Sequence, residues 1–328
     1  MKAWLLDKMG DGVDGLHVGE LPDPTPRENE VVLDVLYAGL NPADRYLAEN
    51  LYPARPTFPH VLGRDGMGAI RAVGPGVRDV RVGEKRLLLR GDVGINRPGM
   101  FAQRATVPVE SIAPVPAGWN DEEAAGAATV YITAHQSILQ WDDLPPQAVV
   151  LVTGASGGVG VATIHLARAL GHTVIGLSRD AEKSKKLREI GADATFDPND
   201  ADWRRKLKDT LGKRRVDLVV ENIGGQLFAD CIDTLGDRGR VSVVGRLAGP
   251  VPNFNTASLI FRRVRIGGVQ VGTYTNAQTR AAWEQIVALL AKTGARPVVD
   301  RVLPFDQLKQ AFARLAEGPM GKVLLRVA

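Results

Sequence analysis

The stretch "AVVLVTGASGGVG", residues 148–160, decides the fold of this chain. Five apolar residues form a strand-like run, glycines follow at positions 154, 157, 158 and 160, and residues 159–171 continue with helical periodicity. Glycines let a backbone approach a pyrophosphate, and the first N–H groups of a helix point at it. The pattern predicts a dinucleotide-binding turn, with a ligand-free glycine turn as the alternative. The predicted contacts are Ala155, Ser156, Gly157, Gly158, Val159 and Gly160.

Further apolar runs follow this turn. They are apolar without alternation and are separated by helical segments, which indicates a parallel sheet covered on both faces. We therefore predict a doubly wound α/β domain. The runs cover residues 172–178, 216–225, 239–245 and 263–272.

The regions on either side of this segment have a different pattern. The first 120 residues contain short β-type runs divided by proline and glycine clusters, which indicates a β-rich unit. Near the end, an amphipathic helix over 275–294 precedes a strand, a helix and a final strand over 321–327. With 328 residues the chain is long for one core, so two domains are expected.

The end of the second strand bears on which nicotinamide cofactor binds. NAD sites usually place an acidic residue there for the ribose 2′-hydroxyl, whereas NADP sites offer Arg or Lys to the 2′-phosphate. This chain has Ser178 and Arg179 there, and Lys183 one turn into the next helix, which favours NADP(H). Asp180 argues against this choice unless it serves only as the N-cap of that helix.

Composition excludes several classes of protein. Apolar residues make up 45% and charged residues 24%, as in ordinary globular proteins. Cys231 is the only cysteine, so an internal disulfide, a four-cysteine zinc site and a CxxC redox pair are excluded. No apolar run reaches about 18 residues and the polar start does not look like a signal peptide, so we expect a cytoplasmic protein with no membrane partner.

Four segments together carry a resemblance to a known family. They are "GASGGVG", "LNPADRY" (40–46), "RDGMGAIRAVGPGVRDVRVGE" (64–84) and "GRVSVVG" (239–245). The chain resembles the medium-chain dehydrogenase/reductase superfamily, and more closely its zinc-free quinone oxidoreductase branch. The resemblance implies a GroES-like catalytic domain over residues 1–120 and 265–328, a Rossmann domain over 121–264, and a homodimer.

The resemblance also assigns roles outside the glycine turn. Asn41 and Tyr46 match positions that face the nicotinamide and the substrate in the family. Many relatives place a tyrosine near the 2′-phosphate where this chain has Pro198. In this chain the 2′-phosphate would therefore rely on Ser178, Arg179 and Lys183. The further residues implied to line the cofactor are Thr129, Asn222, Val244, Gly245, Arg246, Val269 and Val271.

The zinc position of the superfamily is occupied differently in this chain. Zinc-dependent relatives hold a His-Glu pair where this chain has Arg64 and Asp65, and a first ligand near Asn41. Since tetrahedral zinc needs convergent Cys, His or carboxylate ligands, we expect no metal. Without zinc to polarise a carbonyl, electrophilic quinones and α,β-unsaturated carbonyls are favoured as small-molecule substrates. In this hypothesis Asn41 stabilises the oxygen that gains charge, and Tyr46 or solvent supplies the proton.

One basic segment suggests a nucleic-acid partner as an alternative. Residues 202–215 carry seven Lys or Arg residues. Trp203, Leu207 and Leu211 stand at i, i+4 and i+8, which favours an amphipathic helix with a solvated outer face over RNA binding.

Two alternatives concern the activity itself. The segment 246–268 is also similar to acryloyl-CoA reductase-like relatives, in which case Arg262, Arg263 and Arg265 would meet the phosphates of an acyl-CoA. The chain could also bind NADPH without turnover, because the cofactor site is better specified by the sequence than the chemical one.

Overall fold

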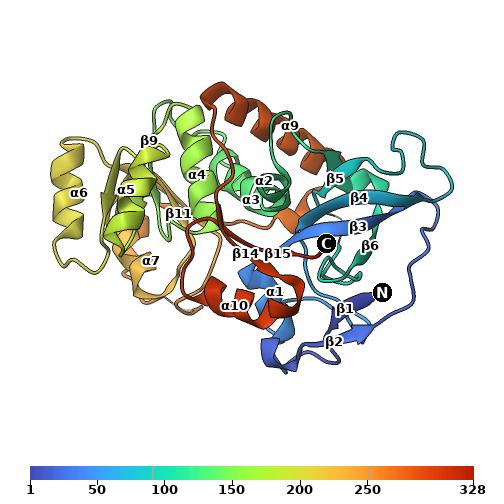
Figure 1. Cartoon of the computed structure of the whole chain (residues 1–328). Helices are drawn as coiled ribbons and strands as arrows, with labels where there is room; N and C mark the ends of the chain where they lie inside the picture. The colour runs from blue at the N-terminus through green and yellow to red at the C-terminus, as the bar shows by residue number, and fades with distance from the viewer. Residues whose placement is uncertain (91, 251) are drawn as a thin grey trace. The chain divides into compact units, whose positions relative to one another are not determined.

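The computed structural model describes residues 1–90, 92–250 and 252–328, and the chain forms two compact units. The first unit comprises Met1–Thr129, Tyr274–Trp283 and Arg296–Ala328, and the second comprises Val130–Thr273 and Glu284–Ala295. Helices and strands carry the labels of Figure 1. The limits given above for the catalytic and Rossmann domains stay a prediction.

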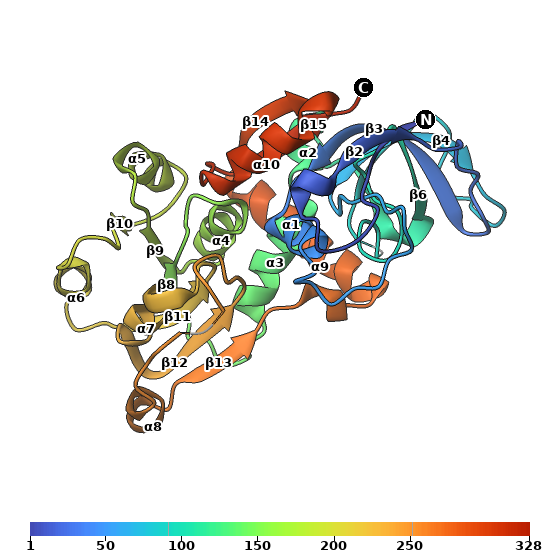
Figure 2. The ribbon, with the colours of Figure 1, turned by 90° about the horizontal axis from the view of Figure 1, so that it is seen from below.

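The second unit is built on a six-stranded parallel sheet with the order β10-β9-β8-β11-β12-β13. The chain starts in the middle of this sheet, builds outward to one edge and then crosses back to build the other half, as Figure 2 lets the reader follow. This is the doubly wound α/β arrangement predicted from the sequence. The strands are β8 (Val149–Val152), β9 (Thr173–Leu177), β10 (Ala194–Phe196), β11 (Val216–Glu221), β12 (Leu235–Val243) and β13 (Arg265–Gly268).

Helices cover this sheet because its strands are apolar on both faces. Trp203 and Leu207 of α6 and Phe228 of α7 pack with strand residues in one buried cluster, whereas α4 and α5 contact β8 to β10. The predicted amphipathic helix in the basic segment is therefore confirmed. Strand β10 was not recognised in the sequence, since three half-buried residues give no apolar run. The helices are α3 (Ala128–Leu139), α4 (Gly158–Ala169), α5 (Ala181–Glu189), α6 (Trp203–Leu211), α7 (Gly225–Ile232) and α8 (Ala257–Arg262). A further helix, α9 (Asn276–Thr293), has residues in both units.

The first unit is β-rich, as predicted. Its larger sheet has the order β14-β15-β3-β4-β5-β7, with β6 also paired to β3, and β1 and β2 form a separate pair. The strands are β1 (Lys2–Leu5), β2 (His17–Glu20), β3 (Glu30–Gly39), β4 (Gly66–Val73), β5 (Lys85–Leu88), β6 (Arg104–Pro108), β7 (Ile112–Pro114), β14 (Val299–Pro304) and β15 (Lys322–Arg326). The helices are α1 (Pro42–Ala48), α2 (Asp121–Ala125) and α10 (Leu308–Ala316).

One consequence of this pairing positions the candidate site. Strand β3 is antiparallel to both β4 and β15. The end of β3 therefore lies beside the starts of β4 and β15, which brings three distant parts of the sequence together.

Among the described residues, no helix is both long enough and apolar enough to span a bilayer.

Candidate active site

The turn between β8 and α4 packs closely against its neighbours because its glycines have no side chains. Helix α4 begins at Gly158 as predicted, with Gly157 as its N-cap. Gly154 has a φ of 54°, a left-handed conformation that favours glycine. A Cβ on Gly160 would lie 2.5 Å from the carbonyl oxygens of Gly154 and Ala155, so a larger residue would force the turn to move.

The first turn of α4 presents unused backbone donors. In the described part of the chain, the N–H groups of Gly158, Val159 and Gly160 meet no acceptor, and the N-cap glycine has no side chain to cap them. Such a helix start binds anions, because the N–H groups and the helix dipole act in the same direction. The turn therefore fits the pyrophosphate of a dinucleotide.

Ser178 and Arg179 follow directly after β9. The Ser178 side chain is buried and its Oγ donates to Asp180 O at 3.3 Å, whereas Arg179 is exposed. Asp180 Oδ1 accepts the Lys183 N–H at 2.9 Å at the start of α5. That hydrogen bond, together with the charges of Lys183 and Lys186, lowers the pKa of Asp180. Asp180 is the N-cap predicted from the sequence, so its carboxylate is engaged by the helix start.

A buried carboxyl group organises the loop after β11. Glu221 Oε1 accepts hydrogen bonds from the N–H groups of Ile223 and Gly224 and from Thr153 Oγ1, at 2.8–3.1 Å. Burial raises the pKa of Glu221. Asn222 Nδ2 donates to Thr153 O at 2.8 Å, which fixes this predicted contact residue beside the end of β8.

The other predicted contacts of the second unit follow the ends of β12 and β13. A Cβ on Gly245 would lie 2.3 Å from Asn222 O, so a glycine is required for this close approach. Because the strands are parallel, all these carboxyl ends share one edge of the sheet, the edge where doubly wound sheets bind ligands. The residues placed there after β12 and β13 are Val244, Gly245, Arg246, Val269 and Val271.

The two predicted catalytic residues lie in the first unit, Asn41 directly before α1 and Tyr46 within it. Asn41 precedes the helix, and its N–H donates to Asp44 Oδ2 at 2.9 Å. Asn41 is buried, whereas Tyr46 is half-buried. Thr129 belongs to this unit too.

Two buried ion pairs meet at Asn41. Arg64 Nε lies 2.9 Å from Asp44 Oδ1, and Lys322 Nζ lies 2.8 Å from Asp65 Oδ2. Lys322 Nζ also donates to Asn41 Oδ1 at 2.7 Å. All five residues are at most 9% exposed. Burial raises the pKa of Asp65, and the neighbouring Lys322 ammonium opposes that rise.

Asp44 and Lys322 were missed in the sequence, although both leave a signal there. Asp44 stands three residues after Asn41, the spacing of a capping box, and Lys322 opens a final strand whose next three residues are apolar. Neither signal identifies the residue with which the side chain pairs. The partners follow from the antiparallel pairing of β3 with β4 and β15.

In this chain, the residues at the zinc position of the superfamily do not fit a metal. Arg64 places a guanidinium there, and the carboxylates of Asp44 and Asp65 are each engaged by a cation. His60 lies nearby, but no three His, Cys, Asp or Glu side chains of the described residues gather as a metal site requires.

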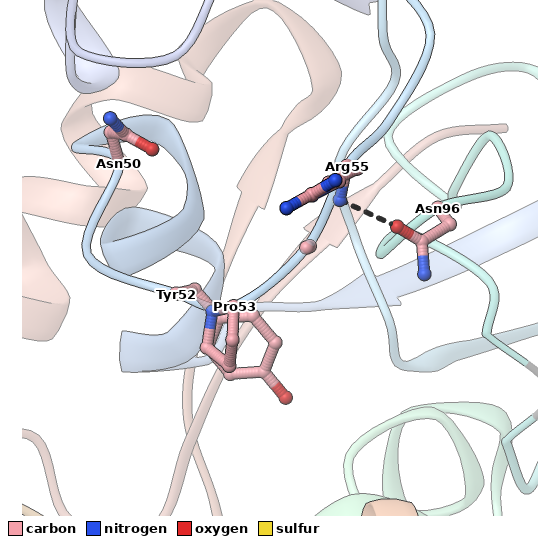
Figure 3. Close-up of a pocket in the computed structure, with 6 residues that line it drawn as sticks. Asn50, Tyr52, Pro53, Arg55 and Asn96 are labelled. Atoms are coloured by element: carbon pink, nitrogen blue, oxygen red, sulfur yellow. Dashed lines mark hydrogen bonds between the residues drawn. The ribbon is translucent and has the colours of Figure 1, made fainter.

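A pocket lies in the first unit (Figure 3). It is lined by Asn50, Tyr52, Pro53, Ala54, Arg55 and Asn96, and the Arg55 N–H donates to Asn96 Oδ1 at 2.8 Å. The Arg64 guanidinium carbon lies 4.5 Å from the centre of the Tyr52 ring. Tyr52 therefore links the pocket to the buried ion pairs.

The three arginines considered for acyl-CoA phosphates each have an acidic partner. Arg262 lies 3.7 Å from Asp233, Arg265 lies 2.6 Å from Asp143, and Arg263 pairs with Asp237. Two of these carboxylates are shared, Asp233 with Arg204 and Asp143 with Arg240. The segment 246–268 also includes residue 251, which lies outside the described residues.

Comparison with known proteins places the chain in a family. Residues 27–117 match the alcohol dehydrogenase GroES-like domain, and residues 158–292 match the zinc-binding dehydrogenase family. A quinone oxidoreductase from Mus musculus is 28% identical, over 92% of this chain and 90% of its own length. A synaptic vesicle membrane protein VAT-1 homolog from Rattus norvegicus is 30% identical, over 92% of this chain and 78% of its own length. The chain belongs to the quinone oxidoreductase-like medium-chain dehydrogenases/reductases.

The medium-chain dehydrogenase/reductase fold is also found among solved structures. A mycobacterial protein solved in complex with NADPH is similar to this chain, with a TM-score of 0.89 and 26% identity, covering 100% of both chains. The family resemblance and the fold class predicted from the sequence are therefore confirmed.

Proposed function

We propose that this medium-chain reductase transfers a hydride from NADPH to a quinone or an α,β-unsaturated carbonyl without a metal. The observation that carries the proposal is the replacement of the zinc ligands by the Arg64 and Lys322 ion pairs around Asn41. An acceptor that is already electrophilic needs orientation and a hydrogen bond rather than a Lewis acid.

The second unit supports NADPH as the cofactor. The start of α4 would hold the pyrophosphate, and Arg179 and Lys183 would meet the 2′-phosphate, while Asp180 is engaged as a helix cap. The NADPH complex of the mycobacterial relative agrees with this assignment. When bound, NADPH supplies a hydride equivalent of two electrons.

Residues of the first unit would complete the reduction. As the hydride adds to the β-carbon of an enone, an electron pair moves onto the carbonyl oxygen, and a hydrogen-bond donor at that oxygen lowers the barrier. We assign this donor to Asn41 Nδ2. The Tyr46 hydroxyl or a water molecule then delivers the one proton that the reduced acceptor needs.

The absorbance of NADPH at 340 nm tests the proposal against the alternative of binding without turnover. Purified protein is mixed with NADPH and with 1,4-benzoquinone, 9,10-phenanthrenequinone, a panel of enones or acryloyl-CoA. We expect oxidation of NADPH with at least one quinone or enone. If no acceptor is reduced, the protein binds NADPH without turnover and the proposal is wrong.

We also propose that the protein forms the homodimer implied by its family. Strand β13 lies at the edge of its sheet and leaves Ile266 40% exposed, and Ile260 and Phe261 of α8 are 69% and 82% exposed. An edge strand and exposed large apolar side chains favour association. Light scattering coupled to size-exclusion chromatography should give a molar mass twice that of the chain. The variant Phe261→Asp should shift this mass toward that of the monomer.

A further inference from the structure

Lys322, the buried lysine at the start of β15, contacts the candidate site through Asn41. Lys322 is 3% exposed, and its Nζ donates to Asn41 Oδ1 and pairs with Asp65. We propose that Lys322 is a positioning residue, which holds the Asn41 carboxamide so that its Nδ2 edge faces the acceptor oxygen that gains charge. This inference rests on the function proposed above.

The orientation follows from the chemistry of an amide. A carboxamide has an accepting oxygen at one end and a donating NH2 group at the other, and an ammonium can only donate. With Lys322 Nζ at 2.7 Å from Oδ1, a flipped Asn41 would place its NH2 group against the ammonium. Of the two N–H bonds on Nδ2, one has a long contact of 3.4 Å to Gly39 O, and the described residues offer no acceptor to the other.

The fold keeps a narrow space for the lysine stem. A Cβ on Gly39 would lie 3.0 Å from Lys322 Cε, and a Cβ on Gly126 would lie 3.1 Å from Lys322 Cγ. Both distances are shorter than ordinary contacts, so either side chain would push the stem away. The two glycines therefore leave the space through which the stem reaches Asn41 and Asp65.

Asn41 is thus held from two sides. Asp44, itself fixed by Arg64, accepts the backbone N–H, and Lys322 binds the side-chain oxygen. A cation on the oxygen also polarises the amide and strengthens its N–H groups as donors. The arrangement would give the acceptor oxygen a fixed, polarised donor without a metal.

Kinetics can separate this role from simple neutralisation of Asp65. Lys322→Met alone would leave a buried carboxylate unpaired and could unfold the protein, so the informative variant is Asp65→Asn/Lys322→Met. We expect its kcat to fall about tenfold or more while KM for NADPH stays within about twofold, since a lost oxyanion donor costs this much or more. Lys213→Met, on an exposed lysine, is the control. Recovery of wild-type kcat in the double variant would show that Lys322 serves only Asp65.

A mutant cycle with Asn41 tests whether Lys322 acts through it. In an Asn41→Ala background, the Asp65→Asn/Lys322→Met change should cost less than about twofold in kcat, because the amide it orients is gone. If the combined variant loses kcat by the product of the two separate fold-changes, Lys322 does not act through Asn41 and the inference is wrong.

An NMR measurement decides the orientation without any turnover. The side-chain amide signals of Asn41, assigned by their disappearance in Asn41→Ala, should shift and exchange faster with water in Asp65→Asn/Lys322→Met. Unchanged signals would mean that Lys322 does not hold the amide. Absence of NADPH oxidation by the wild-type protein would instead count against the proposed function, and the amide signals would still decide the role of Lys322.

Discussion

Arg64 and Asp44 form a buried ion pair, with 2.9 Å between Nε and Oδ1 and side-chain exposures of 9% and 0%. The guanidinium also donates to Ala43 O at 3.0 Å and stacks on the Tyr52 ring. A buried charge that loses its partner is strongly destabilising, whereas an exposed pair contributes little.

Arg64→Leu should destabilise the protein by about 3–5 kcal/mol, because it leaves the Asp44 carboxylate buried and unpaired. Arg45→Leu is the matched control, since Arg45 forms an exposed pair with Glu49 worth about 0–1 kcal/mol. The measurement is the urea concentration at the unfolding midpoint. Equal shifts of the midpoint for both variants would show that the buried pair contributes no more to stability than the exposed pair.

Gly160→Ala should destabilise the glycine turn by about 1–3 kcal/mol, the usual cost of overpacking. The reason is the 2.5 Å approach of the new Cβ to two carbonyl oxygens. Gly157→Ala is a control in the same turn, because its Cβ would meet only Gly154 O at an ordinary 3.4 Å. The two variants are compared by thermal unfolding, and a Gly157→Ala protein that is the less stable of the two would contradict the geometry.

Arg179→Ala and Lys183→Ala should each weaken NADPH binding by about tenfold and leave NADH binding nearly unchanged, since NADH has no 2′-phosphate. Lys185→Ala is the control, because this exposed lysine lies on the same helix, α5. Dissociation constants for both cofactors come from fluorescence titration. A wild-type protein that binds NADH more tightly than NADPH would show that the assignment of the two basic residues is wrong.

His165 gives a pH-dependent prediction. It lies 2.7 Å from the Tyr131 hydroxyl, and burial lowers its pKa to about 4. An unfolded histidine titrates near about 6.5, so between these values the unfolded chain binds more protons. The stability tied to neutral His165 is therefore full above pH 6.5 and is lost as the pH falls toward 4, by up to about 3 kcal/mol.

The variant His165→Gln isolates this contribution. The unfolding midpoint in urea should fall less between pH 7 and pH 4.5 in His165→Gln than in the wild-type protein. His17→Gln, on an exposed histidine, should behave like the wild type. A wild-type pH dependence in His165→Gln would assign the effect to other groups.

The glycine turn could be predicted because its signals are local. A strand, a left-handed glycine and a helix start lie within residues 148–160, and α4 begins at Gly158 as expected. The prediction of Asp180 as a helix cap likewise depends only on neighbouring residues. Strand β10 was missed for the opposite reason, because pairing with β9 rather than its own composition makes it a strand.

The sequence by itself determined the doubly wound sheet, the cofactor turn and the loss of the zinc ligands, since each depends on neighbouring residues and on backbone preferences. Only the tertiary structure decided what replaces the zinc. Asn41 and Lys322 are 281 positions apart, and they meet because β3 runs antiparallel to β4 and β15. Buried charges must find partners across such distances, and which partner each finds depends on strand pairing that no local pattern encodes.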